Sequence, residues 1–139
     1  MSLPFTIGAK SSLSNKVTSA DITTFADITG DTNPLHLDHE YASQTRFGKC
    51  IAHGILGAGL ISAVLGTLLP GPGTIYLSQE LKFLHPVFSG DTITAEVEII
   101  SIKVEKAILT IDTNCFNQDD TQVMGGRAVV KYEPVEGAV

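Results

Sequence analysis

The sequence predicts an α+β fold in which a curved antiparallel β-sheet wraps one long apolar helix. Two observations support this. Apolar residues recur at helical spacing in the first half of the chain, and apolar and polar residues alternate in the second half. Between them, residues 50–79 contain no Asp, Glu, Lys or Arg, so a helix in this stretch is too apolar to lie on a surface. Helices followed by strands are typical of α+β proteins.

Length and composition restrict the class of protein. The 139 residues fit one domain, which we expect to cover residues 1–139 with a core over about residues 12–132. Hydrophobic residues make up 43% and charged residues 17%, which excludes a disordered chain. The net charge of −6 argues against a nucleic-acid-binding surface.

Cysteine content and the N-terminus bear on the compartment. Cys50 and Cys115 are too few for a disulfide framework, and they fit a reducing compartment. The first ten residues contain two Pro or Gly residues and no apolar run, so we expect no signal peptide. The expected location is cytoplasmic, or mitochondrial if a targeting peptide has been removed.

The N-terminal third is predicted to contain short elements. A short strand is expected around Leu13–Val17. Thr18 and Asp21 have the spacing of a capping box, and Gly30 stands where a helix-ending glycine is expected. Residues 31–34 are rich in turn formers, and Asp38 is positioned to cap a second short helix.

The long uncharged helix is expected to begin near His53-Gly54 and to end before Pro70. Its helical part, residues 55–69, is fifteen residues long, whereas a membrane-spanning helix needs about twenty mostly apolar residues. We therefore expect no membrane span and a core helix covered by protein on nearly all sides.

Four long strands are expected after this helix, near residues 75–83, 93–104, 109–115 and 123–132. The alternation slips by one residue at Ile99-Ile100, as at a β-bulge. Hairpins are predicted around residues 89–91, 105–106 and 119–120. Because an exposed sheet edge offers unpaired backbone groups, we also expect a homodimer.

The densest polar cluster covers residues 29–39. A carboxylate at Asp31 and an imidazole at His36, separated by a turn containing Pro34, can face one cleft and move protons at neutral pH. The alternative is that Asp31 caps a turn and His36 is an ordinary loop residue. A metal site of His36, Asp38 and His39 is disfavoured because adjacent residues rarely face one ion, so no metal is expected.

Three residues near or within the apolar helix are further candidates. The Gly54 amide at a helix start can stabilise negative charge on a carbonyl oxygen, although a glycine there also suits tight packing. His53 is either an orienting residue or a buried histidine bonded to backbone. Ser62 is polar within the apolar helix, where serines usually bond to their own backbone.

Three segments together resemble the MaoC-like (R)-specific enoyl-CoA hydratases. They are Phe25-x-x-x-Thr29-Gly30-Asp31-x-Asn33-Pro34-Leu35-His36-x-Asp38, Ile51-Ala52-His53-Gly54-Ile55-Leu56 and Leu81-x-Phe83-x-x-Pro86-Val87-x-x-Gly90-Asp91. The resemblance covers roughly residues 12–132, and the first segment is the most specific.

This resemblance implies a hot-dog fold, usually dimeric, and a role for each matching residue. Asp31 and His36 correspond to the pair that holds a catalytic water, and Gly54 to the glycine whose amide binds the thioester oxygen. Ser62, Asn33 and His53 are the implied substrate-binding or orienting residues. No cofactor is implied.

The implied function is reversible hydration of trans-2-enoyl-CoA to (R)-3-hydroxyacyl-CoA in fatty-acid or polyhydroxyalkanoate metabolism. The alternative is an (R)-3-hydroxyacyl-acyl-carrier-protein dehydratase, since residues 77–80 and the Pro-Gly-Pro-Gly turn resemble mitochondrial enzymes of that kind. A non-catalytic thioester-binding module is less favoured because both Asp31 and His36 are present. A thioesterase would generally place a carboxylate on the long helix, which has none.

Overall fold

The computed structural model describes residues 2–136 and consists of one five-stranded antiparallel sheet and four helices. The helices are α1 (Ser19–Thr29), α2 (Pro34–Leu37), α3 (His39–Ser43) and α4 (Gly54–Thr67). The strands are β1 (Lys10–Lys16), β2 (Thr74–Phe83), β3 (Thr92–Lys103), β4 (Ile108–Phe116) and β5 (Gln122–Tyr132), and a 3₁₀ turn, η1 (Val104–Lys106), joins β3 to β4.

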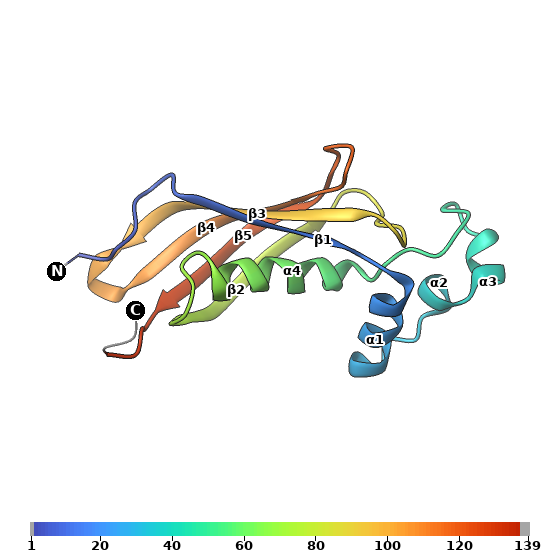
Figure 1. Cartoon of the computed structure of the whole chain (residues 1–139), viewed down its shortest axis with the longest axis horizontal. Coiled ribbons are helices and arrows are strands. Elements are labelled where there is room, and N and C mark those ends of the chain that lie inside the picture. The colour runs from blue at the N-terminus through green and yellow to red at the C-terminus, as the bar shows by residue number, and fades with distance from the viewer. Residues whose placement is uncertain (1, 137–139) are drawn as a thin grey trace.

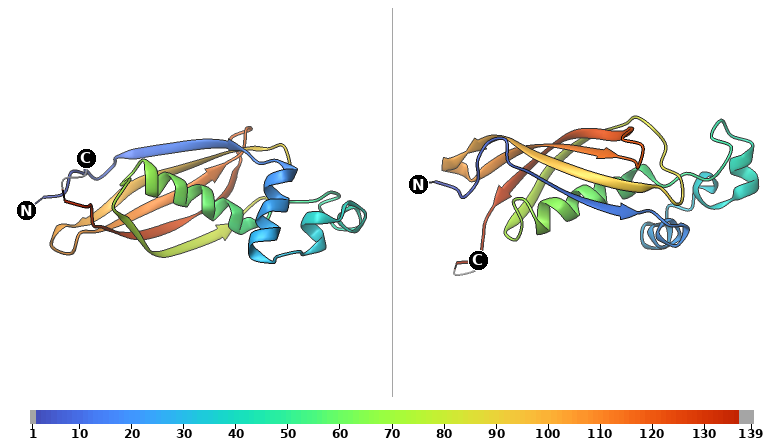
Figure 2. Two further views of the ribbon diagram at one scale, coloured as in Figure 1. Left: turned by 60° about the horizontal axis from the view of Figure 1, so that its bottom comes forward. Right: turned by 45° about the horizontal axis from the view of Figure 1, so that its top comes forward.

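The sheet is ordered β1-β3-β4-β5-β2, and α4 lies along one of its faces (Figure 1). Helices α1, α2 and α3 gather at one end of the molecule, while the chain termini and η1 lie toward the other end (Figures 1 and 2). Among the described residues, no helix is both long enough and apolar enough to cross a membrane.

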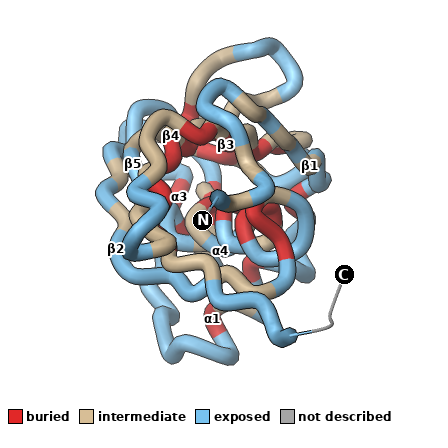
Figure 3. Tube along the Cα trace, turned by 90° about the vertical axis from the view of Figure 1, so that its left-hand side faces the viewer, coloured by how far each residue is buried: buried red, intermediate tan, exposed pale blue. Residues whose placement is uncertain are grey.

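The core lies between α4 and the sheet. Buried and half-buried residues alternate along β3 and β4, as expected when one face of each strand packs inward. From α4, Ile61, Val64 and Leu65 are almost completely buried against that face. In the end-on view of Figure 3, buried segments lie mainly on the sheet strands and on α4, while the outer loops are mostly exposed.

Several local predictions are confirmed. Thr18 and Asp21 form a reciprocal capping box at the start of α1, and Gly30 ends the helix in the left-handed conformation. Asp38 caps α3 by accepting a hydrogen bond from the Tyr41 amide. The β3–β4 register shifts between Ile99 and Ser101, at the bulge indicated by the change of alternation.

The predicted hairpin at residues 89–91 is wrong. Strand β2 pairs with β5 and not with β3. Residues 84–91 therefore carry the chain from β2, at one edge of the sheet, past β5 and β4 to β3. Alternating hydrophobicity shows which face of a strand is buried but not which strand is its neighbour. Gly126 permits this pairing, because a Cβ there would collide with the Glu80 carbonyl group of β2.

Three further expectations need correction. The N-terminal strand begins at Lys10, three residues earlier than expected, and pairs with β3. The turn at residues 31–34 leads directly into α2, because the Asn33 side chain caps that helix and Pro34 occupies its first position. Helix α4 is covered on one side only, since Ile55, Gly59 and Ser62 are exposed in the single chain.

Candidate active site

Asp31 follows the glycine that ends α1, and local hydrogen bonds fix its backbone. Its amide donates to the Thr29 hydroxyl at 3.1 Å, and one of its carboxylate oxygens accepts from the Asn33 amide at 3.3 Å. The residue is exposed, so the rest of the carboxylate is available to solvent. The carboxylate is thus held on a rigid turn at the surface.

His36 lies on α2, directly after this turn. Its Nδ1–H donates to the Ile51 carbonyl oxygen at 2.7 Å, which leaves Nε2 as the nitrogen with a free lone pair. The side chain is half-buried and lines a cavity. The segment before α4 therefore sets both the orientation and the tautomer of this imidazole.

His53 is buried behind the pair, with only 3% of its surface exposed. Its Nε2–H donates to the Asp31 backbone carbonyl oxygen at 2.9 Å. Its ring stacks on that of His36 with centroids 4.0 Å apart and also contacts Phe25. Nδ1 of His53 is buried without a hydrogen-bond partner among the described residues. His53 thus contacts both members of the predicted pair.

Gly54 is the first residue of α4, and no side chain caps this helix start. The first amides of a helix have no acceptor within the helix, so they are open to a ligand oxygen. A Cβ on Gly54 would lie 2.7 Å from a ring carbon of Phe83, so glycine allows that ring to approach the backbone. His36 and Gly54 line the same cavity of about 330 Å³.

The site can be tested as a metal centre from its donor atoms. One ligand atom from each of Asp31, His36 and His53 lies within 4.8 Å of the other two. Each histidine uses one nitrogen to donate to a backbone carbonyl group, so each could offer only its other nitrogen, Nε2 of His36 and Nδ1 of His53, to an ion. The disfavoured set of His36, Asp38 and His39 differs from this cluster, because Asp38 uses its carboxylate to cap α3.

The side chains of two predicted residues are not part of this cluster. The Asn33 side chain accepts from the Leu35 amide and caps α2, so its visible role is to shape the turn. Ser62 lies on the exposed side of α4, eight residues after Gly54 and hence roughly 12 Å further along the axis. Within one chain, Ser62 is not part of the cavity shared by His36 and Gly54.

Neither cysteine is a candidate nucleophile. Burial raises the pKa of the Cys50 thiol, and the Asp38 carboxylate raises it further. Burial also raises the pKa of Cys115 to about 12. A thiol with a raised pKa forms little of the nucleophilic thiolate near neutral pH.

Sequence reasoning missed most of the cavity wall. From the sequence, Arg46, Lys49, Lys82 and Lys106 are basic candidates for contact with an anionic part of the substrate, but the sequence does not place them. Sequence reasoning also gave no role to the side chains on the crossing from β2 to β3. The wall includes Arg46, Phe47, Phe83, Leu84, His85 and Met124. The motif containing Phe83 and Pro86 was the available signal, since both residues line the cavity.

Comparisons with known proteins agree with this geometry. The model of the MaoC-like domain family matches residues 6–115. The chain is 46% identical to an (R)-specific enoyl-CoA hydratase of Aeromonas caviae, over 90% of this chain and 93% of that protein. It is 44% identical to a 3-hydroxybutyryl-CoA dehydratase of Methylorubrum extorquens, over 95% of this chain and 83% of the relative.

A solved structure of an (R)-hydratase from A. caviae involved in PHA biosynthesis superposes with a TM-score of 0.91 and 44% identity. The match covers 94% of this chain and 99% of that structure. The family match covers most of the chain, including the turn with Asp31 and His36 and the start of α4. This chain therefore belongs to the MaoC-like dehydratase family and has its hot-dog fold.

Proposed function

We propose that this protein is an (R)-specific enoyl-CoA hydratase, which adds water reversibly to trans-2-enoyl-CoA. The observation that carries the proposal is that Asp31 lies next to His36, while His36 lines one cavity together with Gly54 at the start of α4. The relatives support the same chemistry, because two of those described above are named as an (R)-specific enoyl-CoA hydratase and a 3-hydroxybutyryl-CoA dehydratase.

The mechanism follows from the free atoms of the site. The thioester carbonyl oxygen accepts a hydrogen bond from the Gly54 amide. A water molecule donates to His36 Nε2 and to the Asp31 carboxylate, and its oxygen attacks C3. The pair takes one proton from this water and returns a proton to C2. The Gly54 amide stabilises the negative charge that develops on the carbonyl oxygen, a contribution of about 3 kcal/mol for such donors.

We assign His53 a positioning role in this reaction. Its hydrogen bond to the Asp31 carbonyl group and its stacking on His36 support the assignment, since one side chain touches both partners. Asn33 supports the turn through its cap on α2. For Ser62, substrate binding stays a prediction of the family resemblance. The cytoplasmic location stays a prediction from the cysteine content and the N-terminal residues.

We also propose that the protein is a homodimer. On the side of α4 away from the sheet, Ile55 is 59% exposed, and Leu77 and Phe83 on the edge strand β2 are about half exposed. A second copy covering α4 and β2 would remove these apolar groups from water and protect the open edge. Light scattering that gave a monomer at micromolar concentration would contradict this proposal.

The function is tested by following the absorbance of crotonyl-CoA during hydration. Parallel reactions are coupled to (S)-specific and to (R)-specific 3-hydroxyacyl-CoA dehydrogenases. We expect only the (R)-specific enzyme to oxidise the product. Oxidation by the (S)-specific enzyme alone would contradict the assignment. Turnover confined to the acyl-carrier-protein thioester would instead favour the dehydratase of fatty-acid synthesis.

A further inference from the structure

The wall of the cavity that contains Gly54 differs from the whole chain in its charged residues. The whole chain carries a net charge of −6, with fifteen acidic residues and nine basic ones. Among the described residues, however, the cavity wall contains no Asp or Glu, and Arg46 is its one Lys or Arg. A guanidinium on a wall without carboxylates favours an anionic ligand.

The position of Arg46 fits this role. It lies on the loop between α3 and α4, and its guanidinium carbon is 4.5 Å from the centre of the Phe47 ring, which also lines the cavity. Arg46 forms none of the ion pairs found within residues 2–136. The ring therefore orients the guanidinium, while its hydrogen-bond donors remain available for an anion.

The neighbouring cation, Lys49, differs in one informative respect. It lies three residues away on the same loop, and its ammonium group is likewise 4.5 Å from an aromatic ring, that of Phe88. It lines a second depression, which shares His36 with the cavity but does not contain Gly54. Lys49 thus matches Arg46 in charge and surroundings, but not in access to the thioester site.

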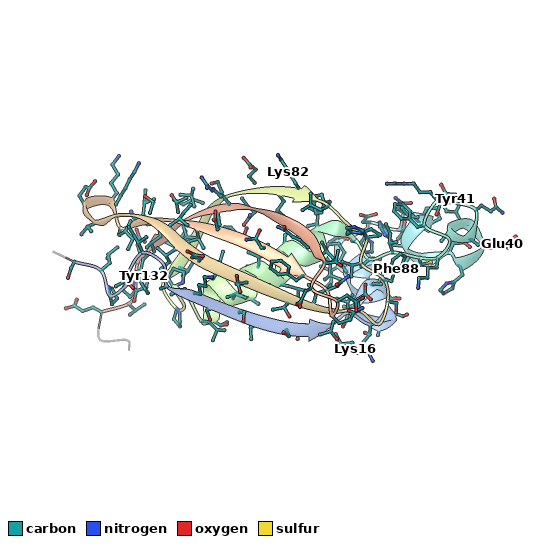
Figure 4. All side chains as sticks on the ribbon, turned by 90° about the horizontal axis from the view of Figure 1, so that it is seen from above. Lys16, Glu40, Tyr41, Lys82, Phe88 and Tyr132 are labelled. Atoms are coloured by element: carbon teal, nitrogen blue, oxygen red, sulfur yellow. The ribbon has the colours of Figure 1, made fainter. Side chains whose placement is uncertain are left out.

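The two other basic candidates lie elsewhere. Lys82 on β2 points away from the sheet (Figure 4). Lys106 belongs to η1, toward the end of the molecule opposite the α3–α4 loop (Figure 1). Neither residue lines the cavity.

We propose that Arg46 binds a phosphate group of the CoA part of the substrate. The inference rests on the proposed function, because it takes the thioester to be held at Gly54. Carbon C3 must face Asp31 and His36, so the sulfur end of the substrate leaves the cavity along a different part of its wall. Arg46 then marks the exit for the CoA moiety. A guanidinium binds phosphate through paired N–H donors, so both its charge and its fork shape contribute.

The experiment compares two substrates that share the reacting atoms. Crotonyl-CoA carries the phosphates, and the crotonyl thioester of N-acetylcysteamine lacks them. Kinetic constants for both are measured with wild type, Arg46→Ala, Arg46→Lys and the matched control Lys49→Ala. We expect Arg46→Ala to raise KM for crotonyl-CoA roughly tenfold, as for the loss of a charge-assisted hydrogen bond.

Constants for the truncated thioester should not change, and this also shows that the variant is folded. Arg46→Lys should recover part of the affinity, while Lys49→Ala should resemble wild type. Equal effects on both substrates, no effect on either, or a CoA-selective effect from Lys49→Ala would each overturn the proposal. Wild-type hydration of the truncated thioester tests the proposed function separately, since that reaction does not involve Arg46.

Discussion

The sheet with α4 and the helical end of the molecule, residues 18–54, are held together in different ways. In the sheet region, residues such as Ile111 and Val97 are completely buried, and long backbone ladders connect the strands. In the helical end, side chains bond to backbone groups: Thr18 caps α1, Asn33 caps α2 and His53 holds the Asp31 carbonyl group. Gly54 is the residue at which the two regions meet.

The two regions therefore contribute to different properties, the sheet region to stability and the helical end to the proposed reaction. Core packing contributes most of the folding free energy, and it is insensitive to polar changes at the surface. The catalytic turn contributes little buried area, but its hydrogen bonds fix the atoms that would contact water and substrate. Substitutions in the two regions should therefore affect different measurements.

The largest effect is expected from the acid–base pair. Asp31→Asn and His36→Ala should each lower kcat for crotonyl-CoA hydration at least about 10²-fold, because each removes a proton acceptor. The melting temperature should remain near that of wild type, since Asp31 is exposed and His36 is only half-buried. Steady-state kinetics and thermal unfolding measure the two quantities. Either variant retaining most of its activity would contradict the assignment.

The opposite result is expected in the core. Ile111→Ala on β4 removes a completely buried side chain and should lower the free energy of unfolding by about 2–5 kcal/mol. Molecules that remain folded should hydrate crotonyl-CoA at close to the wild-type rate, because Ile111 does not line the cavity with His36. Urea unfolding and activity per folded molecule test this. A fall in kcat as large as that of His36→Ala would remove the distinction between the regions.

His53 tests the connection between the regions. His53→Gln keeps an N–H donor the same number of bonds from Cβ, whereas His53→Phe keeps the ring but loses the donor to Asp31. If the hydrogen bond positions Asp31, the Phe variant should lose roughly tenfold in kcat, with KM nearly unchanged, because the reacting groups are misplaced. The Gln variant should retain more activity. A larger loss in the Gln variant, which keeps the donor but not the ring, would indicate that stacking on His36 is the important contact.

The sequence predicted the core better than the contacts within the site. Alternation along β3 and β4 reports directly on burial, and the capping box at Thr18 is a local signal, so both were recognisable. The pairing of β2 with β5 depends on residues about fifty positions apart, which no local pattern connects. Gly126 reflects this pairing through its close approach to Glu80, but its meaning is visible only in the structure.

Within the site, the structure brings Asp31 and His36 close together, as the sequence led us to expect, and it adds His53 to them. Their roles in the reaction stay predictions. The donation from His36 to the Ile51 carbonyl group, the stacking on His53 and the cavity position of Arg46 all depend on how the α3–α4 loop folds back. No periodic pattern describes such a loop, so these contacts could not be predicted.

The smallest effect concerns alkaline pH, and it belongs to the sheet region. Burial raises the pKa of Cys115 from 9.0 to about 12, and burial together with nearby Cys115 raises that of Tyr76 from 10.0 to about 12. Both groups are held neutral in the folded protein. Their contribution to stability is therefore complete below pH 9 for Cys115 and below pH 10 for Tyr76, and it is lost as pH rises toward 12. One such group changes the free energy of unfolding by at most about 1.4 kcal/mol per pH unit, and partly exposed Tyr76 contributes less.

Urea unfolding of reduced protein is measured between pH 8 and pH 10.5. The free energy of unfolding should fall less steeply with pH in Cys115→Ala than in wild type, because in this range Cys115 is the first of the two groups to ionise in the unfolded chain. Tyr76→Phe should follow wild type until about pH 10 and then fall less steeply. Identical slopes in wild type and Cys115→Ala would show that this thiol is not held neutral by the core.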